Sequence, residues 1–208
     1  MEGKFSKNYR KCKYDSKNRF LTYWHQIDEV RRIAPETLLE VGIGGGFVSN
    51  YLKMSGYSVT SVDVDGDLGP DVVADATDLP FDDESFGAVL CCQVLEHMPY
   101  QNALRAVEEF SRITRKHAVV SVPDIGRYSR FMFDVPKLGT IKCLWQLPRF
   151  RHPESPYVPD QHCWEISVKG YGLKKVMDDI RKCSFTVIRT FRVFEAPYYR
   201  FFILEKTK

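Results

Sequence analysis

The sequence predicts an α/β domain in which helices cover both faces of a mainly parallel sheet. Compact apolar runs alternate with segments whose apolar residues recur at helical spacing, and this alternation is typical of such domains. The apolar runs resemble strands that are buried on both faces, as parallel strands usually are. Because 208 residues are enough for a full core, we expect one domain over residues 1–208.

Apolar spacing and turn residues give the order of the elements. We expect helices at residues 17–33, from 47 to a stop at Gly56, after Pro99 to about 113, and at 173–180. We expect strands at residues 37–41, 58–63, 72–74, 86–92 and 117–122, and in two β-rich stretches at 185–194 and 200–204. Residues 1–35 then form an N-terminal helical cap.

Residues 123–160 break this pattern. The segment holds six prolines. It also interleaves basic residues (Arg127, Arg130, Lys137, Lys142, Arg149, Arg151) with aromatic ones (Tyr128, Phe131, Phe133, Trp145, Phe150). It is longer than an ordinary connection, which favours a functional insertion. We interpret it as a lid over an acidic or aromatic acceptor. Stacking and phosphate contacts to RNA are the alternative, as is a solvated basic loop with its aromatic residues packed on the domain.

Composition excludes several classes of protein. A net charge of +3 gives no global polycation for nucleic acid, and no apolar run approaches the ~20 residues of a membrane span. We therefore expect a soluble, cytoplasmic protein. The six cysteines form no CxxC pair and are expected to be free buried thiols. His162–Cys163 lacks a second pair at ligand spacing, so no metal site is expected.

A glycine cluster follows the first predicted strand. Glu40 is followed by Gly42, Gly44 and Gly46 in the pattern E-x-G-x-G-x-G. The dinucleotide pattern GxGxxG would need glycine where Phe47 or Ser49 stands. Glycines allow a tight turn and close approach of a ligand to the backbone. Asp63 ends the second strand about 20 residues later, where a carboxylate can accept ribose hydroxyls.

These motifs resemble the class I S-adenosylmethionine-dependent methyltransferase family, of the type 11-like, small-molecule kind. Residues 74–81 (ADATDLPF) and 89–98 (VLCCQVLEHM) continue the resemblance, which covers residues 38–122 in order. It implies a Rossmann-like fold with a seven-stranded, mostly parallel sheet and one antiparallel edge strand. It also implies S-adenosylmethionine as cofactor and S-adenosylhomocysteine as product. The residues expected to hold the cofactor are Glu40, Gly42, Gly44, Gly46, Asp63, Asp75, Ala76, Cys92 and Gln93.

Fewer motifs point to the residues that bind the methyl acceptor or remove its proton. In this family His97 usually belongs to a structural turn. His162 lies where related small-molecule methyltransferases often place a histidine, a side chain that commonly serves as a general base. We take His162 and Glu165 as candidate catalytic residues. The alternatives are a histidine packed in a connection and a glutamate that caps the next helix.

Three functions remain open at this point. The first is methyl transfer from S-adenosylmethionine to a small molecule. The second is methyl transfer to RNA or protein, although no Asn-Pro-Pro-Tyr-like motif follows the fourth strand. The third is a non-catalytic protein that binds S-adenosylmethionine or S-adenosylhomocysteine. The oligomeric state is also open.

Overall fold

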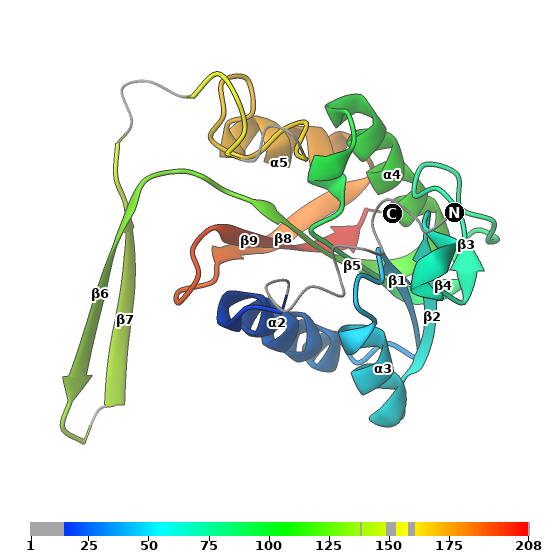
Figure 1. Cartoon of the computed structure of the whole chain (residues 1–208), viewed down its shortest axis with the longest axis horizontal. Coiled ribbons are helices and arrows are strands. Elements are labelled where there is room, and N and C mark those ends of the chain that lie inside the picture. Colours follow the sequence, from blue (N-terminus) through cyan, green and yellow to red (C-terminus); the bar gives the residue numbers. More distant parts are fainter. Residues whose placement is uncertain (1–14, 138, 149–152, 158–160, 208) are drawn as a thin grey trace.

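The structure is a computed structural model that describes residues 15–137, 139–148, 153–157 and 161–207. Its core is a seven-stranded sheet of β1 (Thr37–Val41), β2 (Ser58–Asp63), β3 (Val72–Val73), β4 (Phe86–Cys92), β5 (Thr114–Pro123), β8 (Phe185–Arg192) and β9 (Tyr199–Lys206). The helices of the described chain, besides two short 3-10 turns, are α2 (Lys17–Ile33), α3 (Phe47–Met54), α4 (Tyr100–Ile113) and α5 (Leu173–Lys182). Figure 1 shows them around the sheet.

The strand order is β3-β2-β1-β4-β5-β9-β8. Strands β1 to β5 pair in parallel, whereas β9 is antiparallel to both β5 and β8. The predicted fold class is thus confirmed, and the reversed strand lies one place in from the edge. The chain moves from β1 to one side and then, at β4, to the other. The carboxyl ends of β1 and β4 therefore flank the switch point at which open α/β sheets bind ligands.

The helices form two layers. Helices α2 and α3 cover one face of the sheet, and α4 and α5 cover the other (Figure 1). Each layer encloses its own cluster of buried apolar side chains. Helix α4 illustrates the cause, because Ala103, Val107 and Phe110 lie on one helical stripe and are nearly inaccessible. The sheet is consequently buried on both faces, as the apolar runs predict.

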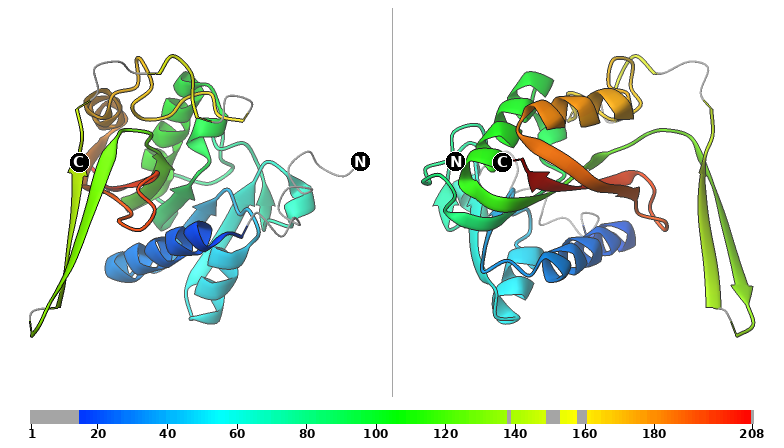
Figure 2. Two further views of the ribbon diagram at one scale, coloured as in Figure 1. Left: turned by 60° about the vertical axis from the view of Figure 1, so that its left-hand side comes forward. Right: turned by 180° about the vertical axis from the view of Figure 1, so that it is seen from behind.

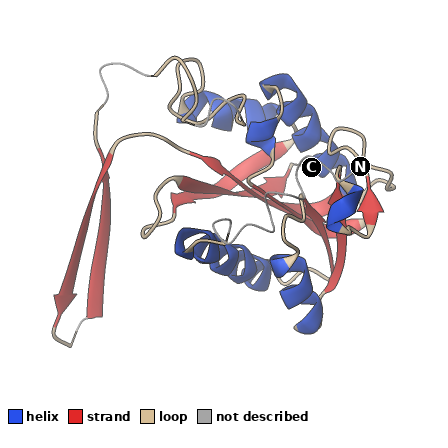
Figure 3. Ribbon diagram, viewed as in Figure 1, coloured by secondary structure: helices blue, strands red, loops and turns tan. Residues whose placement is uncertain are grey.

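Two strands that the sequence does not predict lie inside the insertion. β6 (Tyr128–Val135) and β7 (Gly139–Gln146) form an antiparallel hairpin with a register from Tyr128 opposite Gln146 to Val135 opposite Gly139. The hairpin projects from one side of the domain, as Figure 1 and the right-hand view of Figure 2 show. Most of its residues are exposed. No strand is predicted at 128–146 from the sequence, and the hairpin forms a separate small sheet there, as Figure 3 shows.

Smaller differences concern ends of elements and cysteines. β5 begins at Thr114, earlier than expected, since the chain leaves α4 directly into the strand. The five described cysteines are free, but Cys143 and Cys163 are exposed rather than buried. Cys12, Arg149, Phe150, Arg151 and Asp160 lie outside the described residues. Within the described chain, no helix combines the length and the apolar character needed to cross a lipid bilayer.

Candidate functional site at the carboxyl edge of the sheet

The glycine loop leaves β1 at the switch point. Gly42, Gly44 and Gly46 have φ angles of 85°, 55° and 74°, which side chains with a Cβ rarely adopt. A Cβ on Gly42 would lie 2.1 Å from Cγ2 of Val94, so the loop packs closely against the turn that follows β4. Gly46 caps α3 and accepts the N–H of Asn50 at 3.1 Å. The loop thus offers exposed backbone and a helix start at one place.

Asp63 ends β2 beside this loop. Its Oδ2 accepts the N–H of Ile43 at 3.0 Å, and its Oδ1 accepts the N–H of Asp65 at 3.0 Å. Burial raises the pKa of Asp63, although these N–H donors partly oppose the shift. Each carboxylate oxygen keeps a second lone pair. The carboxylate is therefore held in place and can still accept two hydroxyls of a ribose.

Glu40 lies within β1, between Ser61 of β2 and Leu90 of β4. It is buried, and its Oε2 has no hydrogen-bond partner among the described residues. Burial raises the pKa of Glu40 to about 8. A buried carboxyl oxygen without a hydrogen-bond donor raises the free energy of the folded state, so a ligand that donates to it would bind favourably. The ammonium group of a methionine moiety is a donor of the right charge.

Asp75 and Ala76, two predicted cofactor residues, lie shortly after β3 at the same edge of the sheet. Oδ1 of Asp75 accepts both the N–H and the hydroxyl of Thr77, at 2.8 and 2.7 Å. This Asx turn orients the carboxylate and leaves its other oxygen for an amino group. Ala76 is buried.

Cys92 and Gln93 stand at the end of β4. Gln93 has a φ of 59°, in the left-handed region, and donates its N–H to the carbonyl of Ser121 at 2.9 Å. Burial raises the pKa of the Cys92 thiol, so the group stays protonated and unreactive. The structure therefore brings all nine predicted cofactor residues to the ends of β1, β2, β3 and β4, on one edge of the sheet.

The two candidate catalytic residues contact each other. Nδ1 of His162 lies 2.6 Å from Oε1 of Glu165, and both side chains are largely buried. Glu165 also accepts the N–H of Tyr157 at 2.6 Å and the hydroxyl of Tyr198 at 2.8 Å. Burial raises the pKa of Glu165, but these three donors outweigh burial and hold its pKa below the ordinary value. Helix α5 starts at Leu173, so Glu165 does not cap it.

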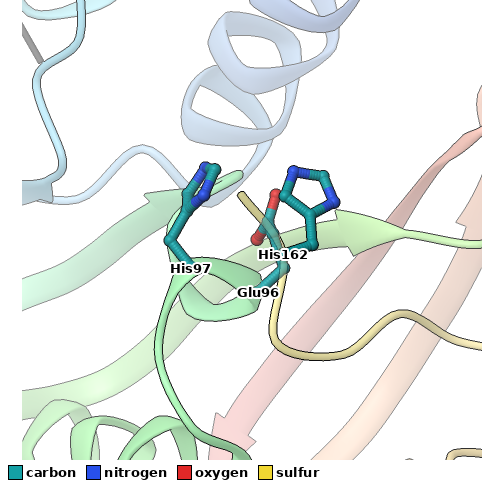
Figure 4. A group of neighbouring side chains, drawn as sticks. All are labelled: Glu96, His97 and His162. Carbon is teal, nitrogen blue, oxygen red and sulfur yellow. The ribbon is translucent and has the colours of Figure 1, made fainter. Parts of the chain in front are cut away.

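Hydrogen bonds attach the 161–164 segment to the turn after β4. Cys163 donates its N–H to the carbonyl of Glu96 at 2.7 Å, and Nε1 of Trp164 donates to the carbonyl of Leu95 at 3.0 Å. Nδ1 of His97 lies 2.9 Å from the carbonyl oxygen of Gln161. The rings of His97 and His162 are consequently 4.9 Å apart (Figure 4).

Two residues near His162 and Glu165 could not be assigned to this site from the sequence. Tyr198 reaches Glu165 from the turn before β9, and His97 reaches His162 from the turn after β4. No spacing in the chain indicates either contact. The only signal for His97 is its place directly after a strand that ends at the predicted site, where the sequence analysis assigns it to a structural turn.

The sheet order, the glycine loop at its switch point and the acid at the end of β2 define the class I methyltransferase fold. Residues 39–122 match the methyltransferase domain family. Over that segment the chain is similar to the class I S-adenosylmethionine-dependent methyltransferases, whose cofactor is S-adenosylmethionine. The residues described above fit this cofactor, since Glu40 supplies a partner for its ammonium group and Asp63 for its ribose.

Solved structures share the fold over most of the chain. One is 1,6-didemethyltoxoflavin-N1-methyltransferase of Burkholderia thailandensis with its substrate and S-adenosylhomocysteine (14% identity, TM-score 0.63, 98% of this chain and 84% of that chain). Another is magnesium protoporphyrin IX methyltransferase of Synechocystis PCC 6803 with S-adenosylmethionine (13%, 0.63, 99% and 93%). A third comes from a complex with the Trm112 methyltransferase activator of Haloferax volcanii (11%, 0.61, 92% and 93%).

Proposed function

We propose that this protein transfers a methyl group from S-adenosylmethionine to a nucleophilic atom of a small molecule. One observation carries the proposal: the turn at 93–97 contacts both halves of the site. Val94 packs under Gly42 of the cofactor loop, and His97 packs against His162. A basic side chain and a cofactor loop on one short turn suit the transfer of a group from one ligand to another.

The cofactor supplies an electrophilic methyl group on a sulfonium, so the protein has to position the acceptor and manage its proton. His162 suits the second task. Glu165 receives three donors and acts as an acceptor, which keeps the proton of His162 on Nδ1 and the lone pair on Nε2. Nε2 then removes the proton of the acceptor, while Glu165 stabilises the imidazolium that forms.

In this proposal, the insertion at 123–160 forms a lid over the bound methyl acceptor. Its hairpin carries exposed aromatic and apolar side chains, namely Tyr128, Phe131, Met132, Phe133, Ile141 and Trp145. Arg130 donates to the carbonyl of Glu195 at 2.7 Å, and Nζ of Lys142 lies 2.6 Å from Oε1 of Glu195. Glu195 engages these two basic side chains while the aromatic and apolar ones stay exposed, so we favour a flat apolar acceptor over RNA.

The solved neighbours support the same class of acceptor, because two of them act on 1,6-didemethyltoxoflavin and on magnesium protoporphyrin IX, both small molecules. An RNA or protein methyltransferase is the alternative. One neighbour is solved in complex with the Trm112 methyltransferase activator, so dependence on an activator protein belongs to this alternative. A protein that only binds the cofactor is the third class. We place the protein in the cytoplasm, where the cofactor is made and free thiols persist.

The test is transfer of labelled methyl groups from S-adenosylmethionine into a fractionated cell extract, followed by identification of the labelled species. We expect the label in a small-molecule fraction, and label in RNA or protein would favour the alternative. His162→Asn and Glu165→Gln should each slow the transfer at least tenfold. His117→Asn, on β5 and away from this edge, is the matched control. Unchanged turnover in both site variants would remove the base mechanism. Thermal stabilisation by NAD and not by S-adenosylhomocysteine would overturn the cofactor assignment.

A further inference from the structure

Three potential metal ligands from two distant segments meet beside the cofactor loop. Glu96 and His97 lie on the turn after β4, and His162 lies on the loop that crosses it (Figure 4). One ligand atom from each of the three side chains lies within 4.8 Å of the others. Ligand spacing along the sequence pairs His162 only with its neighbour Cys163 and does not reveal this cluster. The cluster depends on the fold, because hydrogen bonds attach residues 161–164 to the turn.

The hydrogen bonds of the two histidines leave the same nitrogen free on each ring. Nδ1 of His97 contacts the carbonyl oxygen of Gln161 at 2.9 Å. A carbonyl only accepts, so this Nδ1 carries the proton and Nε2 of the neutral ring carries the lone pair. Nδ1 of His162 faces Glu165 at 2.6 Å, and Glu165 already accepts from Tyr157 and Tyr198. Histidine ligands of metal sites are oriented in this way by a carbonyl or a carboxylate on the other nitrogen.

Glu96 supplies the second, independent observation. Its side chain is nearly inaccessible at 1% exposure. Neither of its carboxylate oxygens has a hydrogen-bond partner among the described residues. An unpartnered buried carboxylate costs several kcal/mol of desolvation unless a charge or donor compensates it. A cation bound between this carboxylate and the two imidazoles provides that compensation.

We propose that Glu96, His97 and His162 bind a divalent transition metal ion, with zinc as the ion that two imidazoles and one carboxylate suit best. Zinc bonds of about 2.0–2.2 Å place the ligand atoms of a tetrahedral site roughly 3.3–3.5 Å apart. The ligand atoms, which now lie within 4.8 Å of one another, have to approach by up to about 1.5 Å when an ion binds. Three protein ligands leave a fourth position open, as in catalytic zinc sites.

The open fourth position of the ion could hold the methyl acceptor, and this step alone rests on the proposed function. An acceptor oxygen bound to the ion loses its proton more easily, because a bound cation lowers the pKa of its ligands. Nε2 of His162 is then a ligand and no longer a base. Metal binding itself requires neither methyl transfer nor an acceptor, so the two proposals fail separately.

The test is titration of the metal-free full-length chain with zinc chloride by calorimetry, and with cobalt chloride by visible absorption. We expect about one ion per chain and a cobalt spectrum of a site with nitrogen and oxygen ligands. His97→Asn and His162→Asn should each weaken zinc binding at least 100-fold. Glu96→Gln, which preserves the buried volume, should do the same. His117→Asn on β5 is the matched control and should bind like the unaltered chain.

Glu165→Ala provides a second kind of variant, because it keeps all three ligands and removes the group that orients His162. Loss of such an outer partner weakens metal binding by about 10–100-fold, so an intermediate affinity supports the site. Zinc binding that is equally tight in all three ligand variants overturns the proposal, as does the absence of zinc binding in the unaltered chain. Circular dichroism and binding of S-adenosylhomocysteine, measured on each variant, report the fold and the cofactor site independently of the ion.

Discussion

Asp124 and Arg200 form an ion pair in the interior of the protein, just where the insertion leaves the sheet. Nε of Arg200 lies 2.7 Å from Oδ2 of Asp124, and Nη2 of Arg192 lies 2.9 Å from Oδ1. The side chain of Asp124 is 1% exposed, and those of Arg192 and Arg200 are 3% and 8% exposed. One carboxylate thus connects β8 and β9 to the start of the insertion after β5.

Asp124→Asn should destabilise the fold by about 3–5 kcal/mol, because it leaves two buried guanidinium groups without a counter-charge. Urea unfolding followed by circular dichroism measures this loss. Asp134→Asn is the control, since Asp134 lies on the exposed hairpin and accepts a hydrogen bond from the hydroxyl of Thr140. It should change the free energy of unfolding by less than about 0.5 kcal/mol. Equal stability of the two variants would contradict the structural importance of the ion pair.

Gly42→Ala should weaken both the fold and the binding of S-adenosylhomocysteine. The added Cβ would lie 2.1 Å from Val94, at a φ of 85°. The conformation alone costs about 1–2 kcal/mol, and displacement of the turn that carries Gln93 adds to it. Gly45→Ala is the matched control for stability, because its Cβ would meet no atom within 4 Å. Calorimetry below both melting temperatures compares cofactor affinity. Unchanged affinity in Gly42→Ala would show that the loop does not hold the ligand.

The central sheet and the cofactor residues could be predicted because their signals are local. A strand buried on both faces is a compact apolar run, and the glycines and Asp63 follow such runs directly. In contrast, β6 and β7 bury neither face, so no side of the hairpin carries the periodicity that reveals a strand. No strand could therefore be predicted in this segment.

Long-range polar contacts, in contrast, depend on tertiary structure. Asp124 meets Arg200 across 76 residues, and Tyr198 meets Glu165 across 33. His162 could be proposed because it lies where related small-molecule methyltransferases often place a histidine, and Glu165 follows it closely in sequence. Glu165 also gains two donors that no pattern indicates. Polar contacts of this kind follow from how loops cross, which hydrophobic periodicity does not encode.

Trp145→Ala separates the insertion's role in function from its role in stability. The indole is 62% exposed, so the free energy of unfolding should change by less than about 0.5 kcal/mol. If the hairpin contacts the acceptor, transfer of labelled methyl groups into the extract should fall several-fold while affinity for S-adenosylhomocysteine stays the same. Thr140→Ala, near the tip of the hairpin, is the control. Full transfer by Trp145→Ala would argue against acceptor binding at this side chain.

Asp179 predicts a specific dependence of stability on pH. Burial raises the pKa of its carboxylate, but hydrogen bonds from Lys175, Lys182 and Tyr100 outweigh burial and hold the pKa at about 2. The pKa in the unfolded chain is about 3.9, so the folded state binds the proton less tightly. The stabilisation is therefore complete above about pH 5 and is lost as the pH falls toward 2.

Asp179→Asn should accordingly cost about 1–2 kcal/mol at pH 7, because about two pKa units correspond to that free energy after allowance for the exposed lysines. The difference from the unaltered chain should shrink as the pH falls from 4 to about 2. Urea unfolding at pH 7, 5 and 3 measures it. Asp178→Asn is the matched control, since Asp178 pairs with Arg181 on the surface and exposed pairs contribute little. A difference that persists undiminished at pH 3 would mean that Asp179 stabilises the protein by its shape and not by its charge.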